Sequence, residues 1–231
     1  TVSLLAAVLY LAFADAYDFY SATTTKRAVQ HTGNSGSVFV YLTRYLLANK
    51  SYLINTVGLC GIACFLPLLF GEFQGLNMFP IGLAILCLNT PICTLLSCDP
   101  DLEQAIRVLP GQSGRFCRRY CLFIFIVDGV LAGIYLGSWQ IIHGGIELAH
   151  VGMVLLFAIQ SAILSVILEW KHPIRGWKTE SDLWHHPRKY IVPLAMLLIA
   201  AFVGTYPSVL WIWSAVLLME CGILLYWARR E

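Results

Sequence analysis

Seven stretches of mainly apolar residues, each about 20 residues long, set the strongest limit on what this chain can fold into. Such a segment crosses a bilayer as a helix, because each backbone polar group then finds its partner within the segment. Charged residues make up 12% of the chain, about half their usual share in soluble domains. We therefore predict an all-α, polytopic transmembrane helix bundle with spans at 2–20, 51–70, 78–98, 116–137, 147–169, 190–205 and 209–227.

The Lys and Arg residues are distributed unevenly among the segments that connect the spans. All 15 of them follow the first, third, fifth or seventh span, and loops 71–77, 138–146 and 206–208 contain none. Because cytoplasmic loops collect Lys and Arg, this pattern predicts an N-terminus outside and a C-terminus inside, in a multi-pass protein of the plasma membrane. The formal net charge of +2 is too small to favour nucleic acid as a partner.

One segment before the second span has the pattern of an interfacial helix. Residues 38–47 combine an apolar face with a basic edge at Arg44 and run directly into the span. This arrangement is typical of an amphipathic helix that lies on membrane lipids. The alternative is that the second span begins early and is tilted.

Residues 99–110 are predicted to form a short helix between the third and fourth spans. Asp99 is a good N-cap, Pro100 suits the first helical position, and Pro110 ends the helix. The apolar side chains at 102, 106 and 109 recur on one face. An exposed apolar stripe of this kind needs the membrane surface or a partner protein to cover it.

Few polar side chains interrupt the spans, and we expect them to face the bundle interior. They are Asn55, Asn89, Asp128, Gln160 and Glu220. The last four form a possible translocation path, in which the two carboxyl groups are either protonated or line a hydrated route. The sequence Asn89-Thr90-Pro91 also predicts a kink in the third span, because Pro91 has no N–H to donate.

The sequence contains none of the common catalytic motifs. There is no GxxxxGK[ST] phosphate loop, no HExxH zinc helix and no GxSxG elbow. No Cys/His cluster has zinc spacing. We therefore predict no metal, no cofactor and no catalytic residue in this chain.

The layout of these elements resembles an ABC transporter permease of the type-2 exporter class. The resemblance lies in an interfacial helix, six spans with both ends inside, and a short capped helix between the second and third of those spans. The sequences Leu-Leu-Ser-Cys-Asp-Pro-Asp-Leu-Glu at 95–103 and Ile-Arg-Val-Leu-Pro at 106–110 are similar to the sequence that is usual in that family at this position. The implied coupling helix covers 99–110, and its implied ATPase-coupling residues are Asp99, Asp101, Leu102, Glu103, Ile106, Arg107 and Leu109.

The resemblance also implies a domain plan and a function. Residues 1–22 would be the last helix of a preceding half, 23–50 a cytoplasmic linker and interfacial helix, and 51–231 a six-span permease domain. The permease would export a hydrophobic or amphipathic substrate, such as a peptide, lipid or drug. ATP and Mg²⁺ would bind a separate cytoplasmic subunit, and a second permease half or a second copy would complete the assembly.

Two other classes of function are alternatives. One is an integral membrane enzyme that uses Asp128, Glu220 and His150 in a hydrated cavity. Its difficulty is that His150 lies near the outer end of its span, whereas the carboxyl groups lie near mid-membrane. The other is a non-catalytic membrane scaffold or immunity protein, which has no need of a capped cytoplasmic helix.

Overall fold

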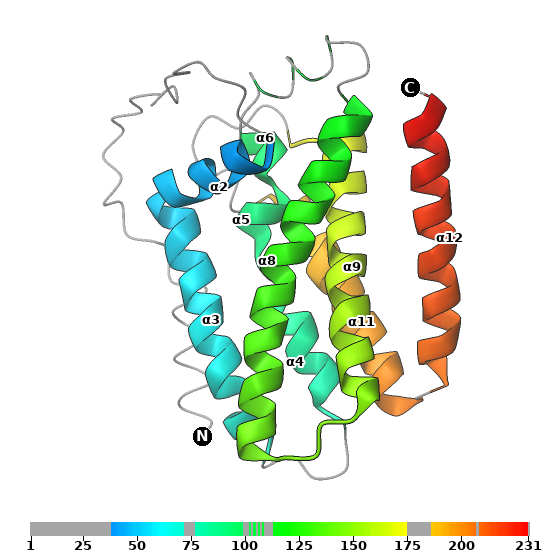
Figure 1. Cartoon of the computed structure of the whole chain (residues 1–231). Coiled ribbons are helices and arrows are strands. Elements are labelled where there is room, and N and C mark those ends of the chain that lie inside the picture. The colour runs from blue at the N-terminus through cyan, green and yellow to red at the C-terminus, as the bar shows by residue number, and fades with distance from the viewer. Residues whose placement is uncertain are drawn as a thin grey trace. The chain divides into compact units, whose positions relative to one another are not determined.

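Helices form every regular element in the part of the chain that the structure, a computed structural model, describes (Figure 1). That part comprises residues 38–71, 77–98, 102, 104, 106, 108, 113–174, 186–206 and 208–230. The chain divides into two units, Thr1–Ser35 and Gly36–Glu231, and all of the described residues belong to the second. The all-α prediction is confirmed for these residues, whereas the predicted span at 2–20 and the linker at 23–37 lie outside them.

Four of the described helices are long and apolar enough to cross a membrane. They are α3 (Lys50–Phe70), α8 (Ser113–Ile142), α9 (Leu148–Lys171) and the continuous stretch Pro187–Thr205, which joins η1 (Pro187–Tyr190) to α11 (Ile191–Thr205). They coincide with the predicted spans at 51–70, 116–137, 147–169 and 190–205. The chain is therefore a helical, membrane-embedded protein with four candidate spans in its described part, where seven were predicted for the whole.

The predicted last span is a helix, α12 (Val209–Arg230), but its described apolar portion, Val209–Gly222, is shorter than the other four. The segment predicted as a kinked span at 78–98 is not one continuous helix but consists of three short helices. These are α4 (Phe79–Leu86), α5 (Thr90–Cys93) and α6 (Leu95–Cys98). We call this segment the broken span.

The first interruption of the broken span lies at residues 87–89 and includes Asn89, the first residue of the predicted kink at Asn89-Thr90-Pro91. The kink prediction is confirmed, since Pro91 cannot donate a hydrogen bond to the carbonyl of Cys87 and the helix ends there. Irregular backbone at membrane depth is tolerated where protein surrounds it. Cys87 and Asn89 are accordingly both buried.

The second interruption, at Thr94, is bridged by a side chain of a neighbouring helix. The Tyr120 hydroxyl of α8 donates a hydrogen bond of 2.7 Å to the carbonyl of Ile92 and accepts one of 3.2 Å from the N–H of Leu95. One phenol thus satisfies a backbone acceptor before the interruption and a donor after it. These groups would otherwise be buried without partners.

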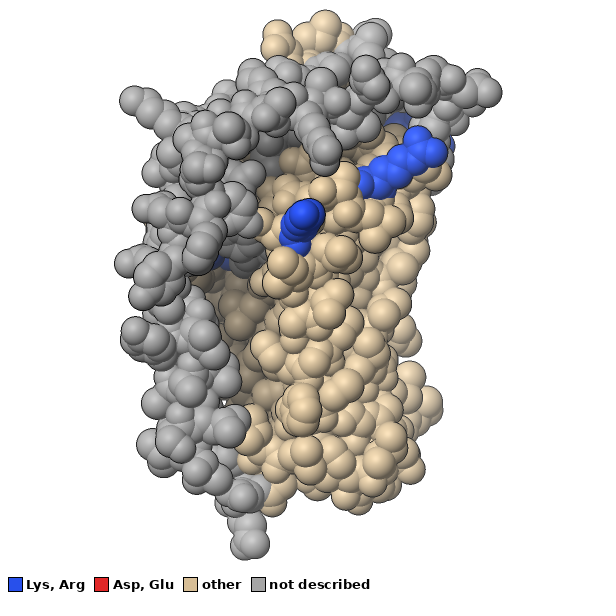
Figure 2. All heavy atoms as spheres, turned by 90° about the vertical axis from the view of Figure 1, so that its left-hand side faces the viewer, with Lys and Arg blue, Asp and Glu red and all other residues tan. Residues whose placement is uncertain are grey.

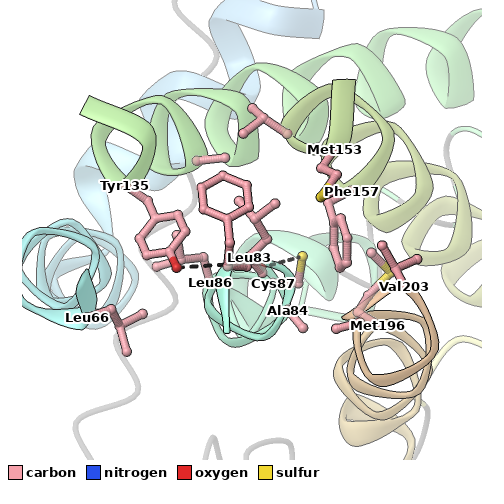
Figure 3. Packing of buried hydrophobic residues seen from close by; sticks show 14 of the residues in the cluster. Leu66, Leu83, Ala84, Leu86, Cys87, Tyr135, Met153, Phe157, Met196 and Val203 are labelled. Carbon is pink, nitrogen blue, oxygen red and sulfur yellow. Dashed lines mark hydrogen bonds between the residues drawn. The ribbon is translucent and has the colours of Figure 1, made fainter. Parts of the chain in front are cut away.

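Helix α4 lies between α3 and α8 on one side and α9 and α11 on the other (Figure 3). Tyr135 of α8 reaches over α4, and its hydroxyl donates a 3.4 Å hydrogen bond to the carbonyl of Phe79. The ring lies so close to Gly82 that a Cβ atom at that position would collide with it. The absence of a side chain at Gly82 therefore allows α8 to pack directly on α4.

Helix α2 (Val38–Ala48) is separate from α3 and lies across the end of the helix bundle (Figure 1). Asn49 interrupts the helical backbone between the two. Leu42 of α2 is fully buried in a hydrophobic cluster with Ile92, Leu96 and Phe116. The structure thus has a distinct helix where an interfacial one was predicted, and it does not continue into the following span.

The basic residues with described side chains lie at one end of the bundle (Figure 1). They lie in α2, at the starts of α3 and α8, at the end of α9 and in η1. They are Arg44, Lys50, Arg115, Arg118, Arg119, Lys171, Arg188 and Lys189. Among the described residues in Figure 2, the blue Lys and Arg atoms lie toward the end that carries α2.

Candidate functional site

Asp128 lies inside the bundle, as predicted, near the middle of α8. Its side chain is buried, and one carboxyl oxygen, Oδ2, accepts a 2.8 Å hydrogen bond from the hydroxyl of Ser161 on α9. The other oxygen, Oδ1, is buried and has no partner among the described residues. The carboxyl group therefore joins α8 to α9 and keeps one unused hydrogen-bonding position.

Asn89 lies at the first interruption of the broken span and is completely buried. Its Oδ1 accepts a 3.1 Å hydrogen bond from Asn55 Nδ2 and a longer one, 3.5 Å, from the hydroxyl of Thr56, both on α3. Its own Nδ2 has no partner in the described part of the chain. Asn89 therefore connects the interruption to α3.

Gln160 and Glu220 form a third polar contact, between α9 and α12. The amide nitrogen of Gln160 donates a 2.7 Å hydrogen bond to Glu220, and its carbonyl oxygen accepts one of 2.9 Å from the indole N–H of Trp213. Asp128 and Glu220 thus bind adjacent residues of α9, Ser161 and Gln160, rather than each other. His150 caps the start of α9 and lies against the ring of Phe79, at a centroid distance of 4.7 Å.

A further set of polar contacts lies at the basic end of the bundle and was not foreseen from the sequence. Glu169, in the last turn of α9, is 1% exposed. Its carboxylate accepts hydrogen bonds of 2.7 Å from the N–H and 2.8 Å from the hydroxyl of Ser97 in α6. It also forms a 2.7 Å ion pair with Nη2 of Arg188 in η1.

The Ser97 hydroxyl completes this network, because it both donates and accepts hydrogen bonds. Besides donating to Glu169, its hydroxyl oxygen accepts hydrogen bonds from the N–H of Ile174 at 2.9 Å and from Nη1 of Arg188 at 3.2 Å. Three helical elements, α6, α9 and η1, are therefore held together around one buried carboxylate. Because the carboxylate has both a charge partner and hydrogen bonds, the cost of burying it is offset.

Three polar residues of α9 follow one face of the helix at a spacing of four residues: Ser161, Ser165 and Glu169. Ser161 binds Asp128, Glu169 binds Ser97, and Ser165 lies between them in a small cleft that Cys87 and Cys93 of the broken span also line. We call this line of groups, from Asp128 to Arg188, the polar seam. Its four-residue spacing in an otherwise apolar helix was a signal that could have revealed it.

The predicted helix at 99–110 is described at four positions, Leu102, Gln104, Ile106 and Val108, all of them helical. Ile106 is 7% exposed and belongs to the hydrophobic cluster around Leu42, and Leu102 packs against the same cluster. The prediction that this stripe needs a membrane or a partner to cover it is therefore wrong for Ile106, because the chain's own core covers it.

The opposite side of that helix is exposed. Val108 is 72% exposed, and Gln104, one turn earlier, is exposed as well. A sequence pattern shows which residues share a face, but not whether that face points inward. The other residues assigned to ATPase coupling, Asp99, Asp101, Glu103, Arg107 and Leu109, lie outside the described residues.

Within the described ranges, no three or more His, Cys, Asp or Glu residues lie together in a way that could hold a metal ion. The polar groups described above form hydrogen bonds between helices, and Glu169 and Arg188 form an ion pair. Comparison with protein-family models, curated proteins and solved structures finds no match for this chain.

Proposed function

We propose that this chain is the permease subunit of an ATP-driven exporter. The observation that carries the proposal is the two-sided helix at 102–108. Ile106 anchors one side in the hydrophobic core, while Val108 and Gln104 leave the other side open. A coupling element needs both properties, because it must bind a partner on one side and transmit the partner's movement to the spans on the other.

The place of this helix in the chain supports the proposal. It follows α6 at the end of the broken span and precedes α8, at the end of the bundle where the described Lys and Arg residues lie. Since basic residues collect on the cytoplasmic side, a cytoplasmic subunit that binds ATP and Mg²⁺ could reach it. The proposal includes seven spans in the plasma membrane, with the N-terminus outside and the C-terminus inside.

The substrate proposed is hydrophobic or amphipathic, such as a peptide, lipid or drug. Large apolar side chains are exposed along α3 and α12, among them Phe65, Leu68, Trp211 and Leu218. Lipid, or a second permease half or copy, would cover these faces. A route between two such apolar faces suits a molecule that is itself largely apolar.

The orientation is tested by labelling single cysteines in a thiol-free background with a membrane-impermeant reagent. Cysteines at Gln140 and Ser208 should label from outside the cell, and one at Gln104 should label after the membrane is opened. Labelling of Gln104 in intact cells would overturn the proposed orientation, whatever the substrate is.

The coupling role is tested by Val108→Asp. A charge at this exposed position should leave folding and membrane expression intact, but it would have to be desolvated in the contact with the ATPase subunit, which is unfavourable. We expect the variant to lose most of the co-purifying ATPase and most of the export activity. The measurement is the amount of ATPase bound per permease, together with transport by the purified complex.

The matched control is Leu148→Asp, which places the same charge at an exposed position at the opposite end of the bundle. Leu148 is the first residue of α9, where an acidic side chain is compatible with the helix dipole. The control should keep both the partner and the transport activity. A Val108→Asp variant that behaves like this control would remove the main support for the proposed function.

A further inference from the structure

Helix α2 presents an exposed face that the proposed coupling role does not use. Val40, Arg44 and Leu47 recur at spacings of four and three residues, so they lie on the same side of the helix. All three are exposed, and Leu47 is 59% exposed. Leu42 lies on the opposite side and is fully buried in the bundle. The side of α2 that faces the core is therefore covered, whereas a mixed apolar and basic side is left open.

The corner between α2 and α3 fixes the position of this face. The N–H of Asn49 donates a 3.1 Å hydrogen bond to the carbonyl of Tyr45, and the carbonyl of Asn49 accepts one of 3.1 Å from the N–H of Leu53. Both helices are thus hydrogen-bonded up to the corner. Because α3 is a candidate membrane span that begins at Lys50, α2 lies where this span would leave the bilayer, at the level of the lipid headgroups.

Lys50 is the first residue of the exposed apolar stripe of α3. Ile54 and Val57, four and seven positions later, are both exposed, and the stripe continues to Leu68. A lysine at the end of such a stripe extends its ammonium group to the headgroups while its methylene groups follow the apolar surface. Lys50 and Arg44 are six residues apart, which corresponds to about 9 Å of helical rise. Both charges are therefore presented at the same end of one lipid-facing surface.

Neither of these two charges is neutralised by the surrounding protein. The sequence from 38 to 71 contains no Asp or Glu, and Arg44 and Lys50 form no ion pair with any residue that the structure describes. Arg188, by contrast, has Glu169 as its counter-ion at 2.7 Å. Two unneutralised basic side chains beside exposed apolar ones are complementary to a surface that is both acidic and apolar. An acidic lipid layer has both properties, and it does not require the two charges to converge on one atom.

We propose that the exposed face of α2, together with Lys50, is a binding surface for acidic glycerophospholipids in the leaflet at the basic end of the bundle. The guanidinium of Arg44 and the ammonium group of Lys50 pair with the phosphate oxygens, while Val40 and Leu47 contact the upper part of the acyl chains. A zwitterionic lipid offers the same apolar contact without a net negative charge, so the surface prefers acidic lipids. This role depends neither on an ATPase partner nor on export.

The lipid preference is tested by native mass spectrometry of the purified full chain. The measurement is the dissociation constant of the first bound lipid, for dioleoyl phosphatidylglycerol and for dioleoyl phosphatidylcholine, which have the same acyl chains. Each basic residue near an acidic lipid surface contributes about fivefold, so the acidic lipid should bind about 5–25 times more tightly. Arg44→Gln combined with Lys50→Gln should lower this ratio to about two or less. Arg44→Lys combined with Lys50→Arg keeps both charges and should keep the ratio.

The matched control is Arg118→Gln combined with Arg119→Gln, which removes the same two charges from exposed positions of α8 at the same end. This control should keep most of the preference. Equal losses in the two neutralised variants would mean a general attraction of the basic end and would refute a surface on α2. A parent ratio near one, or a loss of preference in the variant with exchanged charges, would refute it as well.

Two further arms distinguish the lipid from other occupants of this face. Glycerol 3-phosphate carries a phosphate without acyl chains and should not displace the bound acidic lipid; displacement would assign the site to a soluble phosphate compound. A nitroxide attached to Leu47→Cys, in the thiol-free background and in vesicles of the two lipids in equal parts, should collide more often with oxygen dissolved in the bilayer than with a nickel chelate in water. A nitroxide shielded from both would show that a second copy or another protein covers the face, contrary to the proposal.

Discussion

Replacing Glu169 with Gln removes one negative charge from the buried end of α9 and nearly preserves the shape of the side chain. In the native protein, this carboxylate pairs with Arg188 at 2.7 Å and accepts two hydrogen bonds from Ser97. In the variant, Arg188 keeps its positive charge at a site where it is 10% exposed, but it loses its ion pair. We therefore expect Glu169→Gln to destabilise the protein strongly.

Removal of one partner from a buried ion pair costs about 3–5 kcal/mol, because the other charge remains buried and uncompensated. In a chain of 150–250 residues, each kcal/mol lowers the melting temperature by about 2–4 °C. Glu169→Gln should thus melt about 6–20 °C below the parent. Arg188→Met should destabilise the protein less, since Ser97 still donates hydrogen bonds to the Glu169 carboxylate. The double variant, Glu169→Gln with Arg188→Met, should recover part of the melting temperature that Glu169→Gln loses.

The assay is thermal unfolding of the full chain in detergent, followed with a thiol-reactive dye. Cys87 and Cys93 are buried in the native structure and react with the dye when the seam opens. Glu147→Gln is the matched control, because it makes the same change at the exposed N-cap of α9. If Glu169→Gln melts within 2–3 °C of the parent, and the double variant is no better, the seam does not hold this end together.

Three further variants test other contacts. Gly82→Ala should lower the free energy of unfolding by about 1–3 kcal/mol, because the added methyl group overpacks against Tyr135. The melting temperature should fall, and an unchanged melting temperature would mean that α8 can move away from α4. Ile106→Asp should lower the free energy of unfolding by at least about 2–5 kcal/mol, because it places a charge in a buried apolar site. Surface expression should therefore fall along with ATPase binding, and normal expression would contradict the inward placement of this side chain. Asp128→Asn can still accept from Ser161 and should keep the parent's melting temperature but lower export, and unchanged export would assign Asp128 a purely structural role.

The sequence predicted well those features that depend on local composition. Apolar length located α3, α8, α9 and α11, because a span is defined by residues adjacent in the chain. Pro91 located the first interruption of the broken span, because a missing N–H acts within one turn. Asp128 and Asn89 were correctly expected to be buried, because an exposed polar group in lipid is costly.

Features that depend on contacts between distant residues were not predictable in the same way. Glu169 binds Ser97, 72 positions earlier in the chain, and pairs with Arg188, which lies in a different helix. At the end of a span, a charged residue is ordinarily expected to face lipid headgroups, so the pattern gave no reason to pair these two. The direction of Ile106 was likewise set by the cluster around Leu42, which helical periodicity does not reveal.

The broken span and the polar seam have one physical cause. Interruption of a helix inside a membrane frees backbone groups that cannot bind water, so neighbouring helices must supply polar side chains at those positions. Tyr120 of α8 supplies one at Thr94, and Glu169 of α9 supplies one at Ser97. The same contacts tie α6, which leads into the proposed coupling helix, to α9 and η1. A movement of that helix would therefore be transmitted to α9 and α11 through the contacts of Glu169 with Ser97 and Arg188. For this reason, the interruptions of the broken span are compatible with a coupling role.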